Sequence, residues 1–269
     1  MSVHSSLFLG TAGWSLAREQ WAAFPSEGSQ LQRYAGRFDA VEINTSFYRP
    51  HRPATYAKWA QSVPEAFRFC VKVPKQITHE RRLVDCDELL ARFMSECGQL
   101  GEKLGCLLIQ LPPSLAYDPV SAAAFLTALR ARHAGWVAIE PRHRSWLDAE
   151  ALLERERIAR VAADPAPFPA AAEPGGWPGF RYYRLHGSPR IYYSAYDADW
   201  LGQLAARLAE RQRKGVTCWC IFDNTASGAA TANALDLQSL LAAGGRDTSS
   251  RKRMSDQEPP HRECGQDEA

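Results

Sequence analysis

The chain has 269 residues, of which 45% are hydrophobic and 23% charged, and its formal net charge is +2 at pH 7. This size allows one sizeable core, and the small net charge provides no overall field that would attract nucleic acid or an anionic membrane surface. No stretch reaches the roughly 18 apolar residues that span a bilayer, and the first residues lack the pattern of a secretory signal. We therefore expect a globular, cytoplasmic protein.

Short apolar strands alternate with helical segments along the chain. Strands are predicted at Leu7–Ala12, Ala40–Asn44, Phe67–Val73, Cys106–Leu111, Trp136–Glu140, Ala159–Ala163, Phe180–Leu185 and Thr217–Phe222. Helices are predicted at Ser29–Arg37, Pro53–Gln61, Asp85–Leu104, Val120–His133, Asp148–Glu156, Asp197–Lys214 and Ala226–Ala242. This alternation predicts a (β/α)8 TIM-type barrel. The main alternative is an open doubly wound sheet, but polar residues end nearly every strand instead of clustering at one switch point.

Two segments depart from the alternating pattern. Pro165–Gly179 contains too much proline and glycine for a stable helix, so a loop is predicted between the sixth and seventh strands. From Gly244 onward the chain is polar and has no apolar periodicity. We therefore predict one barrel domain over residues 1–243 and a disordered polar tail over 244–269.

The cysteines and the glycine patterns argue against the common cofactor sites. The chain contains 7 cysteines, an odd number, and most lie in apolar runs, which is typical of free buried thiols. Cys218 and Cys220 have strand spacing, and no second Cys or His pair stands at zinc-finger spacing. The sequence also lacks a dinucleotide-binding glycine motif and a P-loop. No cofactor is predicted, and a divalent metal is left open as an alternative.

Strand parity predicts an ionic barrel interior. Alternate residues of a barrel strand point inward, so the inward set includes Glu42, Asn44, Cys70, Lys72, Glu140, Arg142, Tyr182, Arg184 and His186. One interpretation is an internal salt-bridge network that fixes strand register, and this suits Glu42 and Lys72 because they precede their strand ends. For residues at the C-terminal strand ends a function is favoured, since barrel enzymes place their sites there.

The candidate site residues lie at or just beyond these strand ends. Glu140, His186 and Asp164 are candidate catalytic residues, because a carboxylate with an imidazole can carry out acid–base chemistry. Candidate ligand-binding residues supply amides, a phenol, imidazoles and positive charge: Asn44, Tyr48, Arg49, Lys72, His79, Gln110, Arg142, His143, Arg184, Asp223 and Asn224. The loops after the last two barrel strands often bind phosphate.

A set of short phrases matches one known family in order. They are Gly10-Thr11-Ala12-Gly13-Trp14, Val41-Glu42-Ile43-Asn44, Thr45-Ser46-Phe47-Tyr48-Arg49, Val71-Lys72-Val73-Pro74, Ile77-Thr78-His79, Gln110-Leu111-Pro112-Pro113-Ser114, Glu140-Pro141-Arg142-His143-Arg144-Ser145-Trp146, Arg184-Leu185-His186-Gly187 and Phe222-Asp223-Asn224-Thr225. Over roughly residues 7–241 the chain resembles the YecE-like family of uncharacterised proteins. The resemblance implies a (β/α) barrel and no established reaction.

Three functions remain in competition at this point. The first is an enzyme that acts on a phosphorylated or other small anionic ligand, with Glu140 or His186 moving protons and Arg142 and Arg184 holding the anion. The second is a metal-dependent hydrolase or nuclease, which the neighbouring arginines and lysine disfavour. The third is a non-enzymatic module that binds nucleic acid or a protein through a basic, aromatic rim. The anionic-ligand enzyme is placed first, and no membrane partner is expected.

Overall fold

The strands of the computed structural model, which describes residues 6–255, form two sheets. One sheet has the order β1-β10-β9-β7 and the other β2-β3-β4-β5-β6-β8, and every pairing except that of β8 is parallel. The strands are β1 (Leu7–Thr11), β2 (Ala40–Ile43), β3 (Arg68–Lys72), β4 (Leu104–Gln110), β5 (Trp136–Glu140), β6 (Ile158–Arg160), β7 (Ala162–Asp164), β8 (Gly175–Gly176), β9 (Phe180–Leu185) and β10 (Thr217–Phe222).

Two seams join the sheets into a TIM-type barrel. At the first seam Ala12 bridges to Glu42, and the Gly13 N–H donates to the Glu42 carbonyl over 2.8 Å. At the second, the chain passes from β6, which pairs with β5, to β7, which pairs with β9. The Val161 N–H between them donates to the Ile139 carbonyl over 2.9 Å. The predicted (β/α)8 architecture is confirmed, and its hydrogen-bonded ladder is interrupted at these seams.

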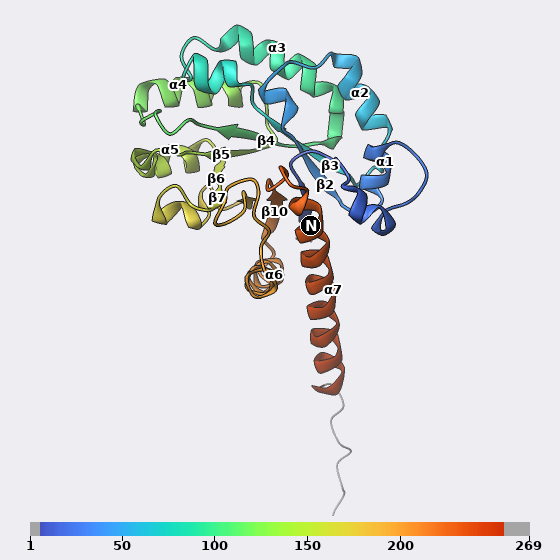
Figure 1. The fold of residues 1–269 in the computed structure, drawn as a ribbon. Coiled ribbons are helices and arrows are strands. Elements are labelled where there is room, and N and C mark those ends of the chain that lie inside the picture. The colour runs from blue at the N-terminus through green and yellow to red at the C-terminus, as the bar shows by residue number, and fades with distance from the viewer. Residues whose placement is uncertain (1–5, 256–269) are drawn as a thin grey trace, which may run out of the picture.

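Helices cover the outer face of the strands, as Figure 1 shows. They are α1 (Gln30–Ala35), α2 (Pro53–Gln61), α3 (Asp87–Cys97), α4 (Pro119–Arg130), α5 (Glu150–Arg155), α6 (Ala198–Arg213) and α7 (Ala229–Ser255). Between β7 and β9 there is only a 3-10 turn, Pro169–Ala172, and the short strand β8, as the proline and glycine content predicted. None of the helices in the described part of the chain is long and apolar enough to cross a bilayer. The cytoplasmic location stays a prediction.

Several element ends differ from the predicted ones. The third helix ends at Cys97 rather than Leu104, because Gly101 takes a left-handed backbone conformation (φ 57°) inside the following 3-10 segment. The predicted sixth strand is split into β6 and β7. Helix α7 extends beyond the predicted end at Ala242, and Figure 1 shows it running away from the barrel. The division into domain 1–243 and tail 244–269 stays a prediction, since residues 256–269 lie outside the described residues.

The predicted strand parity is confirmed. Ile43, Val71, Ile139 and Leu185 point outward and pack in the main core with the helices. The inward residues form a second, smaller core at the N-terminal end of the barrel, which includes Cys70, Leu108, Ala138, Tyr182 and Trp219. The inward positions nearer the C-terminal strand ends are polar and buried: Glu42, Lys72, Gln110, Glu140 and Arg184. The barrel is therefore apolar at its base and ionic at its top.

Close packing at the first seam leads to a stability prediction. A Cβ on Gly10 of β1 would collide with the Ala40 carbonyl oxygen and lie 2.7 Å from the Tyr34 hydroxyl. We expect Gly10→Ala to lower the free energy of unfolding by about 1–3 kcal/mol, because a rigid backbone atom must move. Gly202→Ala is the matched control, since nothing lies near its Cβ position in α6, and it should stabilise by up to about 1 kcal/mol. Urea denaturation of both variants measures the difference; an unchanged Gly10→Ala protein would contradict the packing argument.

Candidate functional site

The Arg184 guanidinium lies at the centre of the ionic layer and contacts three carboxylates. It is fully buried, and its Nη2 lies 2.7 Å from Glu42 Oε1 and 2.9 Å from Asp223 Oδ2. Its Nη1 donates to Glu140 Oε2 over 3.1 Å and to Gln110 Oε1 over 3.3 Å. A buried cation is tolerated only when its donors are satisfied in this way. These contacts place residues from four strands around one group.

His186 lies between two of the same carboxylates. Its Nδ1 is 3.0 Å from Asp223 Oδ2 and its Nε2 is 3.1 Å from Glu140 Oε1. Burial lowers the pKa of His186, but Glu140 and Asp223 raise it by more, so the pKa lies above its ordinary value of 6.5. Each ring nitrogen thus lies at hydrogen-bond distance from one carboxylate, and Arg142 Nη2 lies 3.3 Å from Nε2.

Glu140 accepts hydrogen bonds from three cationic side chains. Arg142 donates to its Oε1 from Nε over 3.0 Å and from Nη2 over 2.8 Å, and Arg184 and His186 supply the remaining contacts. Burial alone would raise the pKa of Glu140, but these cations outweigh it and hold the pKa well below 4.5. We call Glu42, Glu140, Arg142, Arg184, His186 and Asp223 the charge network.

Lys72 lies beside the charge network without an anionic partner. Its side chain is only 4% exposed, and its Nζ sits 4.1 Å from the centre of the Phe47 ring. Among the described residues no carboxylate lies at ion-pair distance from this ammonium, and no hydrogen-bond acceptor contacts it. Burial, followed by the charge of Arg184, lowers the pKa of Lys72 to about 8. Glu42, Asp223 and Glu140 act on this ammonium only from beyond ion-pair distance, and their charges offset part of that lowering.

The remaining predicted catalytic residue is engaged elsewhere. Asp164 follows β7, and its carboxylate accepts a hydrogen bond from the Tyr196 hydroxyl over 2.9 Å, which in turn accepts from the Gly187 N–H. This arrangement fixes the loop after β9. The Asp164 carbonyl accepts from the His186 N–H over 2.6 Å, but its carboxylate contacts neither Glu140 nor the His186 ring. The predicted catalytic trio is thus brought together only in part, with Asp223 at the position beside His186.

Three predicted ligand-binding residues make local structural contacts. His143 caps the turn Arg144–Ala149 by accepting from the Ser145 N–H. The Asn224 amide donates to the Ser194 carbonyl and to Asn233 Oδ1, each over 2.9 Å. His79 bonds to Thr78 and packs edge to face on Phe47. Burial lowers the pKa of His79, and the charges of Lys72 and Arg142 lower it further, so both cations face this imidazole.

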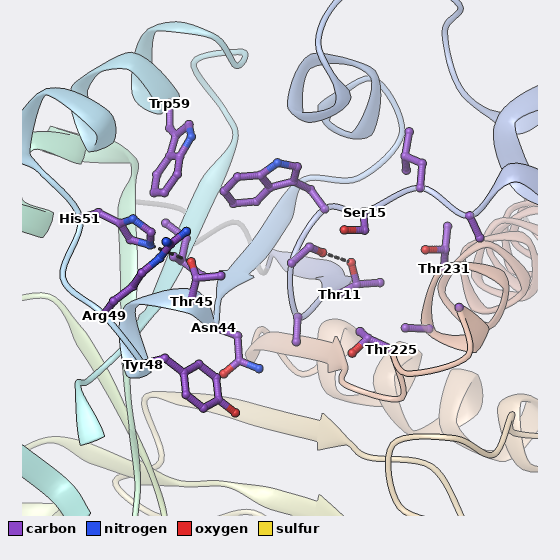
Figure 2. Close-up of a pocket in the computed structure, with 18 residues that line it drawn as sticks. Thr11, Ser15, Asn44, Thr45, Tyr48, Arg49, His51, Trp59, Thr225 and Thr231 are labelled. Carbon is purple, nitrogen blue, oxygen red and sulfur yellow. Dashed lines mark hydrogen bonds between the residues drawn. The ribbon is translucent and has the colours of Figure 1, made fainter. Parts of the chain in front are cut away.

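A cavity of about 670 Å³ opens next to the charge network, between the loops that follow β1, β2 and β10. Figure 2 shows its lining side chains, among which are the predicted residues Asn44, Tyr48 and Arg49. Its other side chains include Trp14, His51 and Trp59, which the sequence does not single out as a group. Of the predicted ligand-binding residues, the cavity thus takes Asn44, Tyr48 and Arg49, and the charge network takes Arg142, Arg184 and Asp223.

The donor set of the charge network is already occupied. No group of three or more His, Cys, Asp or Glu side chains in the described chain is arranged to hold a metal ion. The three carboxylates that converge inside the barrel point at the Arg184 guanidinium instead. A divalent metal would have to displace that cation, which the geometry disfavours.

Comparison with known proteins identifies the family. The model of the protein family "Protein of unknown function DUF72" matches residues 8–259. The chain belongs to this family. The resemblance to YecE-like proteins is confirmed. The chain is 31% identical to the UPF0759 protein YecE of Escherichia coli K12 over 106 residues. It is 27% identical to the UPF0759 protein YunF of Bacillus subtilis 168 over 146 residues. These matches cover 39% and 52% of the chain, and only 38% and 52% of the relatives' own lengths.

Solved structures of the family share the fold. A DUF72 family protein from Enterococcus faecalis V583 superposes with a TM-score of 0.73 at 22% identity, over 88% of this chain and 96% of that one. A DUF72 family protein from Thermotoga maritima gives a TM-score of 0.70 at 25% identity, over 88% and 99% of the two chains. These likenesses support the barrel architecture and assign no reaction.

Removal of the central guanidinium should destabilise the fold strongly. Arg184→Met leaves three buried carboxylates without their common partner, so we expect the free energy of unfolding at pH 7 to fall by about 3–5 kcal/mol. Arg181→Met is the control, because Arg181 lies on the same strand with the opposite parity and contacts backbone carbonyls only; its loss should stay below about 1 kcal/mol. If guanidinium chloride denaturation shows that both variants lose the same free energy of unfolding, the central role of Arg184 is contradicted.

The network also predicts how stability depends on pH. The pKa of Glu140 is lowered on folding, so its contribution is present above the ordinary value of 4.5 and is lost as the pH falls further. The pKa of His186 is raised, so its contribution is complete below 6.5 and is lost as the pH rises through the higher folded pKa. Urea midpoints from pH 3 to 9 for the wild type and His186→Asn test this. His186→Asn should lack the loss of stability that the wild type shows as the pH rises. If the urea midpoints of both proteins fall equally with rising pH, the role assigned to His186 is refuted.

Proposed function

We propose that this protein binds a small anionic molecule, of the phosphate-ester or carboxylate class, at the C-terminal mouth of the barrel. The observation that carries the proposal is Lys72, a largely buried lysine whose ammonium has no carboxylate at ion-pair distance among the described residues. Arg142 supports it, since its side chain remains 19% exposed while it contacts Glu140. An anion that reaches both groups supplies the missing counter-charge.

The balance of charge at the mouth supports an anion over a cation. With His186 protonated, the network and Lys72 hold four positive groups, which are Lys72, Arg142, Arg184 and His186. The carboxylates number three, which are Glu42, Glu140 and Asp223. Because these carboxylates all contact Arg184, the uncompensated positive charge lies nearest Lys72. In a site shielded from water such a charge acts strongly on an incoming anion.

The same arrangement suits proton transfer, and we propose Glu140 and His186 as the acid–base pair. The 3.1 Å contact between His186 Nε2 and Glu140 Oε1 is within the range of direct proton transfer. Asp223 fixes the ring from the Nδ1 side, so only the Nε2 proton is free to move.

Three of the rim cations that a nucleic-acid-binding module would use are engaged within the chain. Lys75 pairs with Glu80, Arg82 donates to Ser114, and the Arg190 guanidinium lies 3.9 Å from the centre of the Tyr193 ring. This observation favours a compact ligand at the mouth over a phosphate backbone that tracks along the rim.

Sulfate binding tests the proposal, because sulfate stays dianionic across the pH range of interest. We expect calorimetry to detect binding at pH 7, and Lys72→Met to weaken it roughly ten- to hundredfold, the equivalent of about 1.5–3 kcal/mol for a charged hydrogen bond. Since the pKa of Lys72 is about 8, affinity for sulfate should fall about tenfold for each pH unit above that value.

Lys75→Met provides the matched control for this measurement. Lys75 carries the same charge nearby, but it is about half exposed and already pairs with Glu80. Its loss should change sulfate affinity less than about twofold, since exposed charges act weakly. Sulfate binding by Lys72→Met at the wild-type affinity, with circular dichroism showing an intact fold, would disprove the proposed anion site.

A further inference from the structure

The cavity between the loops after β1, β2 and β10 carries an amide with no partner. The Asn44 Oδ1 atom is buried and accepts no hydrogen bond, and no contact of its amide nitrogen is found in the described chain. Asn44 occupies the N-cap position of the turn Thr45–Phe47, where an asparagine side chain usually caps, yet it makes no capping bond. Figure 2 shows this amide between Tyr48 and Thr225. In this orientation Oδ1 is shielded from solvent, so the carboxamide presents the N–H donors of its Nδ2 to a guest.

One wall of the cavity is aromatic, with Arg49 beside it. The Trp59 ring meets Trp14 at 5.0 Å and 76° and meets His51 at 5.0 Å and 73°, so these rings contact edge to face and are not stacked on one another. His51 bonds to the Thr45 hydroxyl over 2.8 Å. Burial, followed by the charge of Arg49, lowers the pKa of His51 below 6.5, so the ring is neutral at pH 7. Flat neutral rings of this kind favour a planar aromatic guest.

The opposite wall supplies hydroxyl groups. Thr11, Ser15, Thr225 and Thr231 line it, and Figure 2 shows them across the cavity from Trp59 and His51. No carboxylate is among the described lining residues, and Arg49 is the cation among them. The Thr11 hydroxyl already donates within the chain, and Thr231 is buried. Ser15 and Thr225 are more exposed, and their hydroxyls can donate or accept, which suits a ring with polar substituents.

We propose that this cavity binds the planar nitrogen heterocycle of a nucleobase, and that the ligand of the protein is therefore a nucleoside monophosphate. This inference rests on the proposed anion site for the phosphate group. An amide N–H is a donor that suits a ring nitrogen or carbonyl at the edge of a base, and the tryptophan and imidazole rings supply the apolar contact. The volume of about 670 Å³ lies in the range of small-molecule sites.

The cavity and the mouth are close enough for one ligand to occupy both. Asn44 follows Glu42 of the charge network by two residues, and Thr225 follows Asp223 by two. Two residues of extended chain span roughly 7 Å. The Lys72 ammonium lies over the Phe47 ring. The centre of that ring is 5.0 Å from the centre of the Tyr48 ring, and Tyr48 lines the cavity. The segment Asn44–Tyr48 is thus the boundary between the two sites.

Calorimetry with a matched set of probes tests the inference on the full-length protein. The probes are the four common ribonucleoside monophosphates, their nucleosides, ribose 5-phosphate and sulfate. We expect at least one monophosphate to bind tenfold or more tightly than ribose 5-phosphate. Asn44→Leu should remove this advantage and leave sulfate affinity unchanged. Gln238→Leu is the control, because it removes an amide that bonds to the Arg37 carbonyl outside the cavity, and it should leave every affinity unchanged.

The outcomes separate this inference from the proposed function. Equal affinities for the monophosphates and ribose 5-phosphate, with sulfate binding intact, would overturn the nucleobase site and leave the anion site standing. The nucleobase site would also be overturned if Asn44→Leu weakened binding of ribose 5-phosphate as much as binding of the monophosphates, since the cavity would then bind a sugar. Nucleoside binding that depends on Asn44 but occurs without sulfate binding would support the nucleobase site and refute the anion site. Quenching of tryptophan fluorescence by a bound nucleoside monophosphate gives a second, independent readout. Trp59→Leu should diminish this quenching, whereas Trp21→Leu should retain it.

Discussion

The contact of Arg184 with three carboxylates is the interaction on which the barrel top depends. Arg184 belongs to β9 and Asp223 follows β10, which lie in one sheet, whereas Glu42 and Glu140 come from β2 and β5 of the other. The hydrogen-bonded ladder between the sheets is interrupted at two seams, so this buried guanidinium links them through the barrel interior. The desolvation of such a cation is offset only when every acceptor is in place, and this requirement fixes the register of four strands at once.

This constraint also shapes the candidate site. Because Arg184 engages Glu42, Glu140 and Asp223 together, no carboxylate remains to pair with Lys72 among the described residues. The mouth is left with an ammonium that is buried and unpaired, which favours an anion over a metal ion. The imidazole of His186, held between two carboxylates of the same network, connects this binding surface to groups that can exchange a proton.

The C-terminal face joins two environments of different chemistry. The charge network is ionic and mostly buried, with Arg142 partly exposed, whereas the adjacent cavity is lined mainly by neutral aromatic and hydroxyl side chains. The short segment after β2 supplies both: Phe47 packs under Lys72, and Asn44 and Tyr48 line the cavity. A ligand with a charged group and a planar polar ring satisfies both environments, and neither environment alone explains why the Asn44 amide is left without a partner.

The sequence by itself determined the strand and helix order, the barrel, and the inward parity of Glu42, Lys72, Glu140 and Arg184, because alternation along a strand is a local property of the backbone. It also placed the polar residues at the strand ends. Only the tertiary structure decided that Asp223, not Asp164, lies beside His186, that the sixth strand splits at Val161, and that Trp14, His51 and Trp59 share one wall. These contacts join residues far apart in the chain through loops whose paths depend on packing, which no local period encodes.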